Sequence, residues 1–533
     1  MKTQEIPAEN LLSIIEKRDR EISELKQQIQ WLLAQLRLSK HKQFGASSEQ
    51  TVVDQLSLLN DSELTADLIA PEPEISQVKS HSRKRTRLTT DKLPENLPIE
   101  IIEHILPETE CVCPDCCGKM HSMGTDVREE IKLIPAKALI KRHIRHIYSC
   151  RNCESTSDYV PMIKADMPEP VIKGGFASPE AIAHIATQKF MMASPLYRQE
   201  QEWKQNGIWL SRQTMSNWLI KASEDWLEPI YEEMKRRLCK HDVLHADEST
   251  LQVLKEPGKE AQSKSYMWLY RTSGEATNQI VLYEYQPDRR HIHPKNFLED
   301  FSGFIHTDGY EGYHKLPDNI IVIGCLAHAR RKFCEALKII PKDKQADSSA
   351  AKGVAYFDKL FYLEKQFSLL SHEKRRQERE RLSKPIINEL YSWIEHLNAL
   401  PQTLLGKAVH YSQSQRKYLM GYLLDGRLEI SNNRAERSMK TYVIGRKNWL
   451  FNNTQNGARA SAIYYSIVVT AIENGLNPYE YLTWIFTHAP NIGRPGYVTE
   501  IGDFLPGSTK IPQNVYIPKP KGTEPEKYAW EED

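Results

Sequence analysis

The chain has 533 residues, of which 40% are hydrophobic and 26% are charged. This composition excludes a fibrous protein and a chain that is disordered throughout, and the length predicts about three or four folded units. The 71 Lys and Arg residues balance 70 Asp and Glu residues, so only local clusters of charge can indicate a nucleic-acid partner.

The sequence predicts a cytoplasmic protein without a membrane segment. The longest apolar run, Ala462 to Ile472, is too short to cross a bilayer, and the first residues lack the pattern of a secretory signal. Six of the nine cysteines lie between Cys111 and Cys153. This distribution indicates a reducing compartment and a metal site rather than a disulfide framework.

Residues 8–45 are predicted to form a helix with a heptad pattern. Its apolar positions alternate in steps of three and four, with Arg18 as the one interruption: Leu11, Ile15, Ile22, Leu25, Ile29, Leu32 and Leu36. Such a stripe needs a partner helix to bury it, so we expect a coiled coil that joins protomers into a homo-oligomer. An amphipathic helix that packs on its own protein is the alternative.

Residues 46–105 are predicted to form a linker. Pro71 and Pro73 interrupt regular structure, and the run from Lys79 to Arg87 has five Lys and Arg residues and no acid. Such a run is typical of a solvated segment, and a basic arm that contacts DNA phosphates is the alternative.

Residues 106–165 are predicted to form a zinc-binding module. The segment has two Cys-x-x-Cys pairs: Cys113 with Cys116, and Cys150 with Cys153. Together they supply the four thiolates that a tetrahedral structural Zn²⁺ requires. Runs of β-type residues between Glu130 and Tyr148 predict a hairpin that brings the pairs together. Reduced cysteines without a metal are the alternative.

Residues 170–235 have the pattern of a helix-turn-helix region. Ser178 with Pro179 predicts a helix start, Gly207 interrupts the pattern, and Ser211 predicts a second helix start. A second helix that opens with polar side chains can read DNA. The predicted DNA-binding residues on it are Arg212, Gln213, Thr214 and Asn217. Two helices that pack together and bind no DNA are the alternative.

Residues 240–340 and 426–485 are predicted to form one α/β core. The runs that predict its strands are residues 243–246, 266–271, 279–285, 304–307 and 320–324, and a helix is expected from about Leu326 to Ile339. Residues 341–425 are polar and helical, with no strand signal. Residues 486–533 are rich in Pro and Gly and are predicted to form an extended tail.

Three acids lie where strand ends and a helix start could bring them together. Asp247 is predicted to end the first strand, Asp308 to end the fourth, and Glu436 to lie early in a helix. Such carboxylates suit two Mg²⁺ or Mn²⁺ ions, which promote in-line phosphoryl displacement. Glu248 would point to the opposite face of its strand and is secondary. Alternatively, Asp308 only forms a turn, and Glu436 only pairs with Arg437 on the surface.

Basic residues near these acids indicate a ligand rich in phosphate. Glu436 is the one acid between Arg434 and Arg459, a stretch with six Lys and Arg residues, and another basic group follows the fifth predicted strand. The predicted DNA-contacting residues are His328, Arg330, Arg331, Arg437, Arg446 and Lys447. Trp449 and Phe451 could stack on a base, although core packing is the commoner role of such residues.

The long motifs of this chain resemble those of the large transposase of the IS66 family of bacterial insertion sequences. The similar segments run from about residue 11 to 490 and include HADEST, HTDGYEGY, GCLAHARRKF and NNRAERSMKTYVIGRKNWLF. The resemblance implies a ribonuclease-H-like core with a helical insertion at 341–425. It also implies an Asp-Asp-Glu triad at Asp247, Asp308 and Glu436.

The resemblance further implies a DNA transposase. Such a protein binds the terminal inverted repeats of an insertion sequence, cleaves DNA with metal-activated water and joins the freed 3′-hydroxyl to target DNA. It would work at the bacterial nucleoid, with companion proteins from the same element. A DNA-binding regulator without catalysis and a metal-dependent nuclease without strand transfer are the alternatives.

Overall fold

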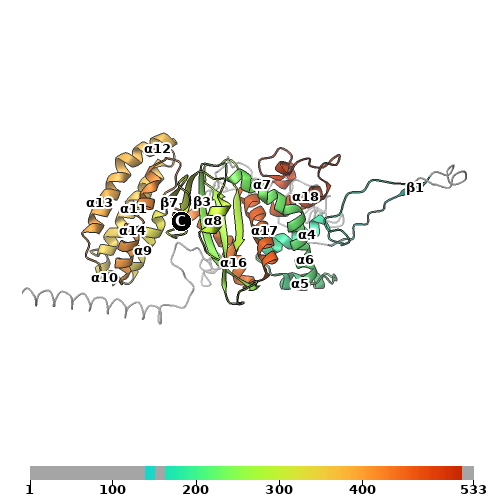
Figure 1. The fold of residues 1–533 in the computed structure, drawn as a ribbon, viewed down its shortest axis with the longest axis horizontal. Helices are drawn as coiled ribbons and strands as arrows, with labels where there is room; N and C mark the ends of the chain where they lie inside the picture. The colour runs from blue at the N-terminus through green and yellow to red at the C-terminus, as the bar shows by residue number, and fades with distance from the viewer. Residues whose placement is uncertain (1–137, 150–161, 519–533) are drawn as a thin grey trace, which may run out of the picture. The chain divides into compact units, whose positions relative to one another are not determined.

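The computed structural model describes residues 138–149 and 162–518 (Figure 1). The chain divides into two compact units, one made of residues 1–45 with 142–516 and one made of residues 46–141 with 517–533. The elements below belong to the first unit. The predicted coiled coil, the linker and the four cysteines of the predicted zinc module lie outside the described residues.

A short hairpin comes first among the described elements. β1 (Ile147–Ser149) pairs antiparallel with β2 (Met162–Lys164), and the residues of both strands are exposed. These strands flank the second Cys-x-x-Cys pair, whereas the sequence predicts a hairpin between the two pairs. The predicted hairpin range, Glu130 to Tyr148, is described only from residue 138 onward, and the one strand that begins in this described part is β1.

Among the described residues, four helices precede the main sheet, and the sequence explains where they begin. They are α4 (Pro179–Phe190), α5 (Leu196–Gln205), α6 (Arg212–Ala222) and α7 (Glu228–Leu238), with the π-helical segment η2 (Ser223–Leu227) before α7. Ser178 Oγ accepts the N–H of Ala181, and Ser211 Oγ accepts that of Thr214, both at 3.1 Å. Gly207 has a φ of +78°, a conformation that favours glycine. Both predicted helix starts and the break between them are confirmed.

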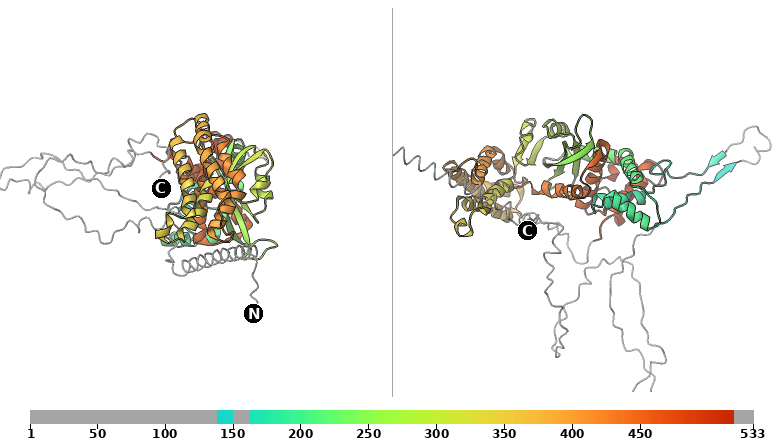
Figure 2. Two further views of the ribbon diagram at one scale, coloured as in Figure 1. Left: turned by 90° about the vertical axis from the view of Figure 1, so that its left-hand side faces the viewer. Right: turned by 90° about the horizontal axis from the view of Figure 1, so that it is seen from below.

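The centre of the unit is a mixed sheet with the strand order β5-β4-β3-β6-β7 (Figures 1 and 2). Its strands are β3 (Val243–Lys255), β4 (Lys264–Thr272), β5 (Val281–Gln286), β6 (Gly303–Thr307) and β7 (Ile320–Gly324). β3, β4 and β5 are antiparallel, while β6 and β7 run parallel to β3. β8 (Asn452–Thr454) pairs with the far end of β3. All five predicted strands are present.

The first of these strands is longer than the sequence predicts. β3 continues to Lys255, so Asp247 lies inside the strand and the prediction that it ends there is wrong. The later residues Leu251 and Val253 are buried, and the pairing with β4 continues to Gln252. Asp and Glu are poor strand formers, so the propensity signal stops at Asp247 although cross-strand pairing carries the strand onward.

Helix α17 (Gln455–Glu473) packs on β5 and is buried along most of its length. Two of its hydroxyl groups satisfy the open edge of that strand. Ser466 Oγ accepts the N–H of Tyr283 at 2.8 Å, and Thr470 Oγ1 accepts that of Val281 at 2.9 Å. Because an unpaired strand edge invites pairing with another chain, α17 protects the sheet. Within the described residues, no helix is both long and apolar enough to cross a membrane.

Two further helices and the C-terminal segment complete this part of the unit. α16 (Asn433–Trp449) packs on β3, and α18 (Pro478–His488) packs on α4. The segment that follows contains the short helices η6 (Ala489–Asn491), η7 (Ile501–Phe504) and η8 (Gln513–Val515). Phe504, Leu505 and Val515 are buried in the main core. The predicted extended tail is therefore wrong for the described residues, because the prediction overlooked apolar residues spaced among Pro and Gly.

A helix at the end of β7 and the helical region (residues 342–423) form a second core. The elements are α9 (Leu326–Lys338), α10 (Lys342–Gln345), α11 (Ser349–Phe367), α12 (His372–Glu378), η4 (Arg379–Ser383), α13 (Lys384–Glu395), α14 (Leu404–Ser414), α15 (Arg416–Leu419) and η5 (Met420–Leu423). Phe333, Phe357 and Leu390 are buried there together with Val243 of β3 and Ile323 of β7. The helices thus pack beside the β7 edge of the sheet (Figure 2). The predicted absence of strands between 341 and 425 is confirmed.

Candidate active site

The structure brings the three predicted acids to one place although they come from different elements. Asp247 lies on β3, Asp308 directly follows the neighbouring parallel strand β6, and Glu436 is in the first turn of α16, which packs on β3. Burial raises the pKa of Asp247 well above its ordinary value, and the charges of Glu248, Asp308 and Glu436 raise it further. The site therefore concentrates negative charge that a cation would neutralise.

Local contacts orient each carboxylate. Asp247 Oδ1 accepts the N–H of Glu248 at 2.8 Å, and Asp308 Oδ1 accepts that of Tyr310 at 2.9 Å. The contact with Tyr310 is turn chemistry, so Asp308 shapes its loop as well as lying beside Asp247. Glu436 is near the N-terminus of a 17-residue helix, where the helix dipole favours a carboxylate.

The donor set fits hard divalent cations. Mg²⁺ and Mn²⁺ prefer carboxylate oxygens, and Glu436 Oε1 is buried without a hydrogen-bond partner among the residues that the structure describes. The carboxylates of Asp247, Asp308 and Glu436 do not form one cluster with every donor within 4.8 Å of the others.

Asn432, which is not among the residues predicted from the sequence, connects the start of α16 to the sheet through hydrogen bonds. Its Nδ2 donates to Ala246 O at 2.8 Å, its Oδ1 lies 3.0 Å from His245 Nδ1, and its backbone N–H donates to Cys325 Sγ at 3.1 Å. Asn432 is buried, so these contacts are shielded from water. They set the position of Glu436 one helical turn later. The Asn pair at the start of α16 is the only sequence signal, and it does not reveal these partners.

An open pocket of about 410 Å³ lies beside Asp308. The other residues that line it include Arg289, Gly309, Tyr310, His328, Lys332 and Tyr411. Lys332 Nζ lies 4.8 Å from the ring centre of Tyr411, and a Cβ on Gly309 would lie 2.7 Å from that ring. Glycine at this position therefore allows α14 to approach the acid. Cations and aromatic rings beside carboxylates suit a nucleic-acid backbone and its bases.

Glu248, which the prediction treats as secondary, lies close to the three acids, since burial and then the charge of Asp308 raise its pKa. Its side chain is 1% exposed and forms an ion pair with Arg289. Tyr313 Oη donates a hydrogen bond to Glu248 Oε2 at 2.6 Å. Arg289 and Tyr313 therefore already provide this carboxylate with a cation and a hydroxyl donor.

The basic residues that follow β7 differ in their surroundings. Arg331 donates to Glu436 Oε2 at 3.1 Å, and His328 Nε2 lies 3.6 Å from Glu436 Oε1. Arg330 instead donates to Asp358 of α11 at 2.6 Å. His328 and Arg331 therefore lie at the predicted acid, whereas Arg330 faces the helical region.

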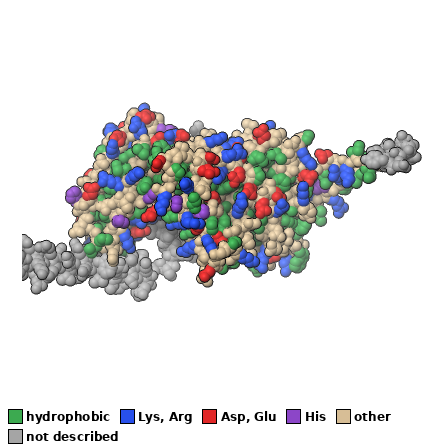
Figure 3. Space-filling view, in the orientation of Figure 1, with side chains coloured by type: hydrophobic (Ala, Val, Ile, Leu, Met, Phe, Trp, Pro, Cys, Tyr) green, Lys and Arg blue, Asp and Glu red, His purple; other side chains and the backbone are tan. Residues whose placement is uncertain are grey.

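The basic residues of α16 also divide into two groups. Arg437 and Lys447 are exposed, while Arg446 donates to two hydroxyl groups of β3 at 3.2 and 3.3 Å. Trp449 packs against the main core, which favours its structural alternative, and Phe451 is exposed. Over the face seen in Figure 3, Lys and Arg side chains are interspersed with Asp and Glu side chains. Positive charge that could bind phosphate is therefore found beside the acids and not over this whole face.

The first turns of α6 are accessible, as the helix-turn-helix prediction requires. Arg212, Gln213 and Asn217 are exposed, and Thr214 is half-buried. Gln213 Nε2 donates to Asn217 Oδ1 at 2.9 Å, and the guanidinium of Arg212 lies 5.7 Å from the ring centre of Tyr197. The polar side chains can therefore reach a ligand without rearrangement of the helix.

Three protein-family models match the chain. The one described as Transposase IS66 family matches residues 174–460, which include the sheet, the three acids and the helical region. The zinc-finger binding domain of transposase IS66 matches residues 110–154, and Transposase C of IS166 homeodomain matches residues 31–102. The last two matches support a structural zinc ion and DNA as a partner.

Curated proteins from Sinorhizobium fredii (strain NBRC 101917 / NGR234) are similar to the chain over most of its length. The uncharacterized protein y4hP is 28% identical over 495 residues, which are 87% of this chain and 86% of the relative. The uncharacterized protein y4jD is 28% identical over 483 residues, which are 87% of this chain and 91% of the relative. The names of these relatives state no activity.

Proposed function

The chain belongs to the IS66 transposase family, and from this premise we propose that it is a DNA transposase of the Asp-Asp-Glu type. It binds the terminal inverted repeats of an insertion sequence, cleaves a DNA strand at the element end and joins the freed 3′-hydroxyl to target DNA. The observation that carries the proposal is the placement of Asp308 and Glu436 beside Asp247: Asp308 follows β6, the strand next to β3, and Glu436 begins α16, the helix that packs on β3.

Each side chain of the site has a role in this proposal. Asp247, Asp308 and Glu436 hold two Mg²⁺ or Mn²⁺ ions, which when bound activate the attacking oxygen and stabilise the leaving oxygen. Asn432 keeps Glu436 at the sheet through its buried contacts. Lys332, in the pocket beside Asp308, binds a phosphate next to the one that is cut.

We infer that the sheet is a ribonuclease-H-like core and that residues 341–425 are inserted into it. Three antiparallel strands continued by two parallel strands support this reading, as does the packing of α16 on β3. The insertion separates β7 and α9 from α16 in sequence. It then returns the chain to the sheet at Asn432, directly before the helix that carries Glu436.

DNA binding and pairing of protomers belong to the other segments in this proposal. Zn²⁺ is held by the thiolates of Cys113, Cys116, Cys150 and Cys153. The exposed residues of α6 contact the element ends, and the homeodomain match includes the basic run Lys79–Arg87, which supports the phosphate-contacting alternative for that run. A coiled coil at residues 8–45 pairs protomers so that two ends meet, and companion proteins of the element assist.

Asp247→Asn separates DNA binding from chemistry. The variant is expected to bind linear DNA carrying the inverted repeats that flank the gene as the unaltered chain does. It should lose Mg²⁺-dependent strand cleavage by at least about 10³-fold, because ion placement provides both the nucleophile and charge stabilisation. Gel-shift and cleavage assays on the same DNA measure the two steps.

Asp318→Asn is the matched control, since Asp318 is exposed in the loop before β7, and it should keep both steps. Normal cleavage by Asp247→Asn would contradict the assignment. The products of the unaltered chain distinguish the alternatives: cut and joined DNA indicates a transposase, cut DNA alone a nuclease, and bound but intact DNA a regulator.

A further inference from the structure

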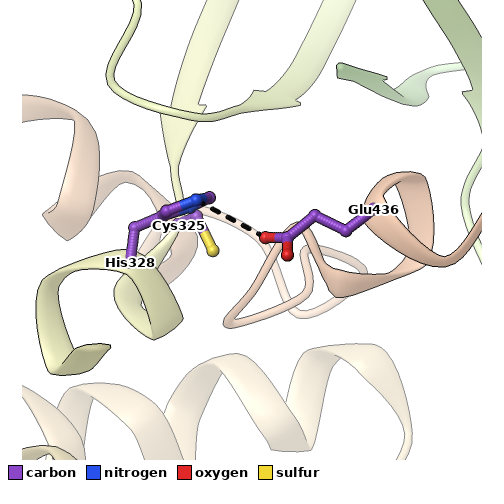
Figure 4. A group of neighbouring side chains, drawn as sticks. All are labelled: Cys325, His328 and Glu436. Carbon is purple, nitrogen blue, oxygen red and sulfur yellow. Dashed lines mark ion pairs between the residues drawn. The ribbon is translucent and has the colours of Figure 1, made fainter. Parts of the chain in front are cut away.

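A second group of possible metal ligands shares one residue with the proposed catalytic acids. Cys325 lies between β7 and α9, His328 is in the first turn of α9, and Glu436 comes from α16 (Figure 4). One donor atom from each lies within 4.8 Å of the other two, and this is the only such group of three or more among the described residues. A thiolate, an imidazole and a carboxylate are the ligand types that Zn²⁺ takes.

Burial raises the pKa of the Cys325 thiol to about 11, so its sulfur keeps a proton until a cation binds. Its Sγ accepts the backbone N–H of Asn432 at 3.1 Å, and this contact and the backbone N–H groups of Ala327 and His328 partly offset the effect of burial. These two groups belong to the open N-terminus of α9, where the helix dipole stabilises an anion. Cys239 and Cys334, the other cysteines of the described part, belong to no such group.

The spacing of the other two donors suits a metal better than a hydrogen bond. His328 Nε2 and Glu436 Oε1 are 3.6 Å apart, which is too long for a strong hydrogen bond. Two ligands about 2.0–2.1 Å from a tetrahedral Zn²⁺ lie about 3.4 Å apart. Arg331 already holds Glu436 Oε2, so Oε1 is the oxygen left for the ion.

We propose that Cys325, His328 and Glu436 form a Zn²⁺ site separate from the four-cysteine module, with water or a phosphate oxygen as the fourth ligand. On binding, the Cys325 thiol releases its proton to solvent and a zinc–sulfur bond forms. Mg²⁺ avoids sulfur ligands, so the two metals compete only for Glu436. Zn²⁺ at this site therefore withdraws Glu436 from the Mg²⁺ ions and inhibits cleavage, a consequence that rests on the proposed function.

The number of zinc ions bound per chain tests for the site without any activity assay. The full chain and its variants are equilibrated with Zn²⁺, freed of excess ion and analysed by elemental mass spectrometry. Cys325→Ser and His328→Gln are each expected to lose one zinc ion per chain, or to bind it at least about 10–100-fold more weakly. Cys334→Ser, a change on the same helix outside the group, should retain it.

Co²⁺ substitution identifies the ligand. Charge-transfer absorption from sulfur to Co²⁺ should decrease in Cys325→Ser and persist in Cys334→Ser. In a Cys113→Ser background, which removes a ligand of the other module, Cys325→Ser should still remove one further ion. Equal zinc content and affinity in the unaltered chain, Cys325→Ser and His328→Gln would overturn the site.

Inhibition is a separate measurement, so its failure is distinguishable from that of the site. The Zn²⁺ concentration that halves Mg²⁺-dependent cleavage should rise at least about tenfold in Cys325→Ser, whatever its zinc-free rate. Loss of one zinc ion with unchanged inhibition would retain the Zn²⁺ site and refute the competition for Glu436. Absence of cleavage by the unaltered chain would refute the proposed function and leave the zinc result standing.

Discussion

The helical region and the site around Asp247 on the sheet accommodate buried charge in opposite ways. In the helical region, Arg379 is 1% exposed and forms two hydrogen bonds to the carboxylate of Glu364, at 2.7 and 2.9 Å. Its guanidinium also donates to the backbone carbonyls of Tyr422, Asp425 and Leu428. In the sheet, the charges that act on Asp247 are those of other carboxylates.

The difference indicates which region is complete without a ligand. A buried charge that is paired and fully hydrogen-bonded holds elements together, whereas gathered like charges raise the energy of the folded chain until a cation neutralises them. The helical region therefore acts as structure that shapes one wall of the pocket through Tyr411. The carboxylates around Asp247 on the sheet gather negative charge, and the metal ions of the proposed chemistry would neutralise it.

Arg379→Met is expected to have the largest effect of the changes that test this comparison, because it removes the buried cation that pairs with Glu364. Removing one partner of a buried ion pair costs about 3–5 kcal/mol. The loss should fall on the helical region first, since Arg379 joins α11 to η5 and to the segment after it. Hydrogen exchange measured by mass spectrometry should show lost protection in α11 and α13 and retained protection in α17.

Arg381→Met is the matched control for that change. Arg381 is two residues away, its side chain is 65% exposed, and it pairs with Glu378 at 2.6 Å on the surface. Exposed pairs contribute about 0–1 kcal/mol, so exchange should be nearly unchanged. Equal effects of the two substitutions would show that Arg379 does not hold the region together.

The sequence predicts the elements of both regions better than it predicts contacts between them. Ser178 and Ser211 mark helix starts because their capping partners are three residues away. Asp308 and Glu436 could be selected because each follows or begins a recognisable element. The role of Asn432 could not be predicted, since its partners Ala246 and Cys325 are more than 100 residues away.

Two errors have the same physical origin. Asp247 was expected at a strand end because local propensity stops there, yet pairing with β4 continues the strand. The segment after residue 490 was expected to be extended, yet Phe504 and Val515 pack into the main core. In both places tertiary contacts override the local secondary-structure preference. Short stretches of sequence carry no information about these long-range contacts.

Glu284→Gln tests whether the sheet carries unbalanced charge beyond the three acids. Burial raises the pKa of Glu284 to about 7, and its Oε2 is buried without a hydrogen-bond partner in the described part of the chain. Between its ordinary pKa and about 7, the folded chain binds more protons than the unfolded chain. The free energy of unfolding should therefore fall as the pH rises through this window and level off above it.

The substitution should remove this pH dependence and stabilise the chain at pH 8 by about 1–3 kcal/mol. Denaturant unfolding followed by tryptophan fluorescence from pH 5 to pH 8 measures it. Glu299→Gln, at an exposed position after α8 (Ile292–Phe297), should keep the slope of the unaltered chain. A slope that survives in Glu284→Gln would assign the proton uptake to another group.

Lys332→Met tests the boundary where the two regions meet, and its expected effect is the smallest. Lys332 lies on α9 with its Nζ over the ring of Tyr411 from the helical region, beside Asp308 in the same pocket. If it contacts one DNA phosphate, its loss should weaken DNA binding about tenfold at low salt. It should also reduce by about 1 the slope of the logarithm of the binding constant against the logarithm of the salt concentration.

Lys338→Met, an exposed change at the end of the same helix, should leave this slope unchanged. Because Tyr411 holds the ammonium in place, Tyr411→Leu should give part of the same loss. An unchanged slope in Lys332→Met would mean that the pocket binds no phosphate and that the helical region does not take part in DNA recognition there.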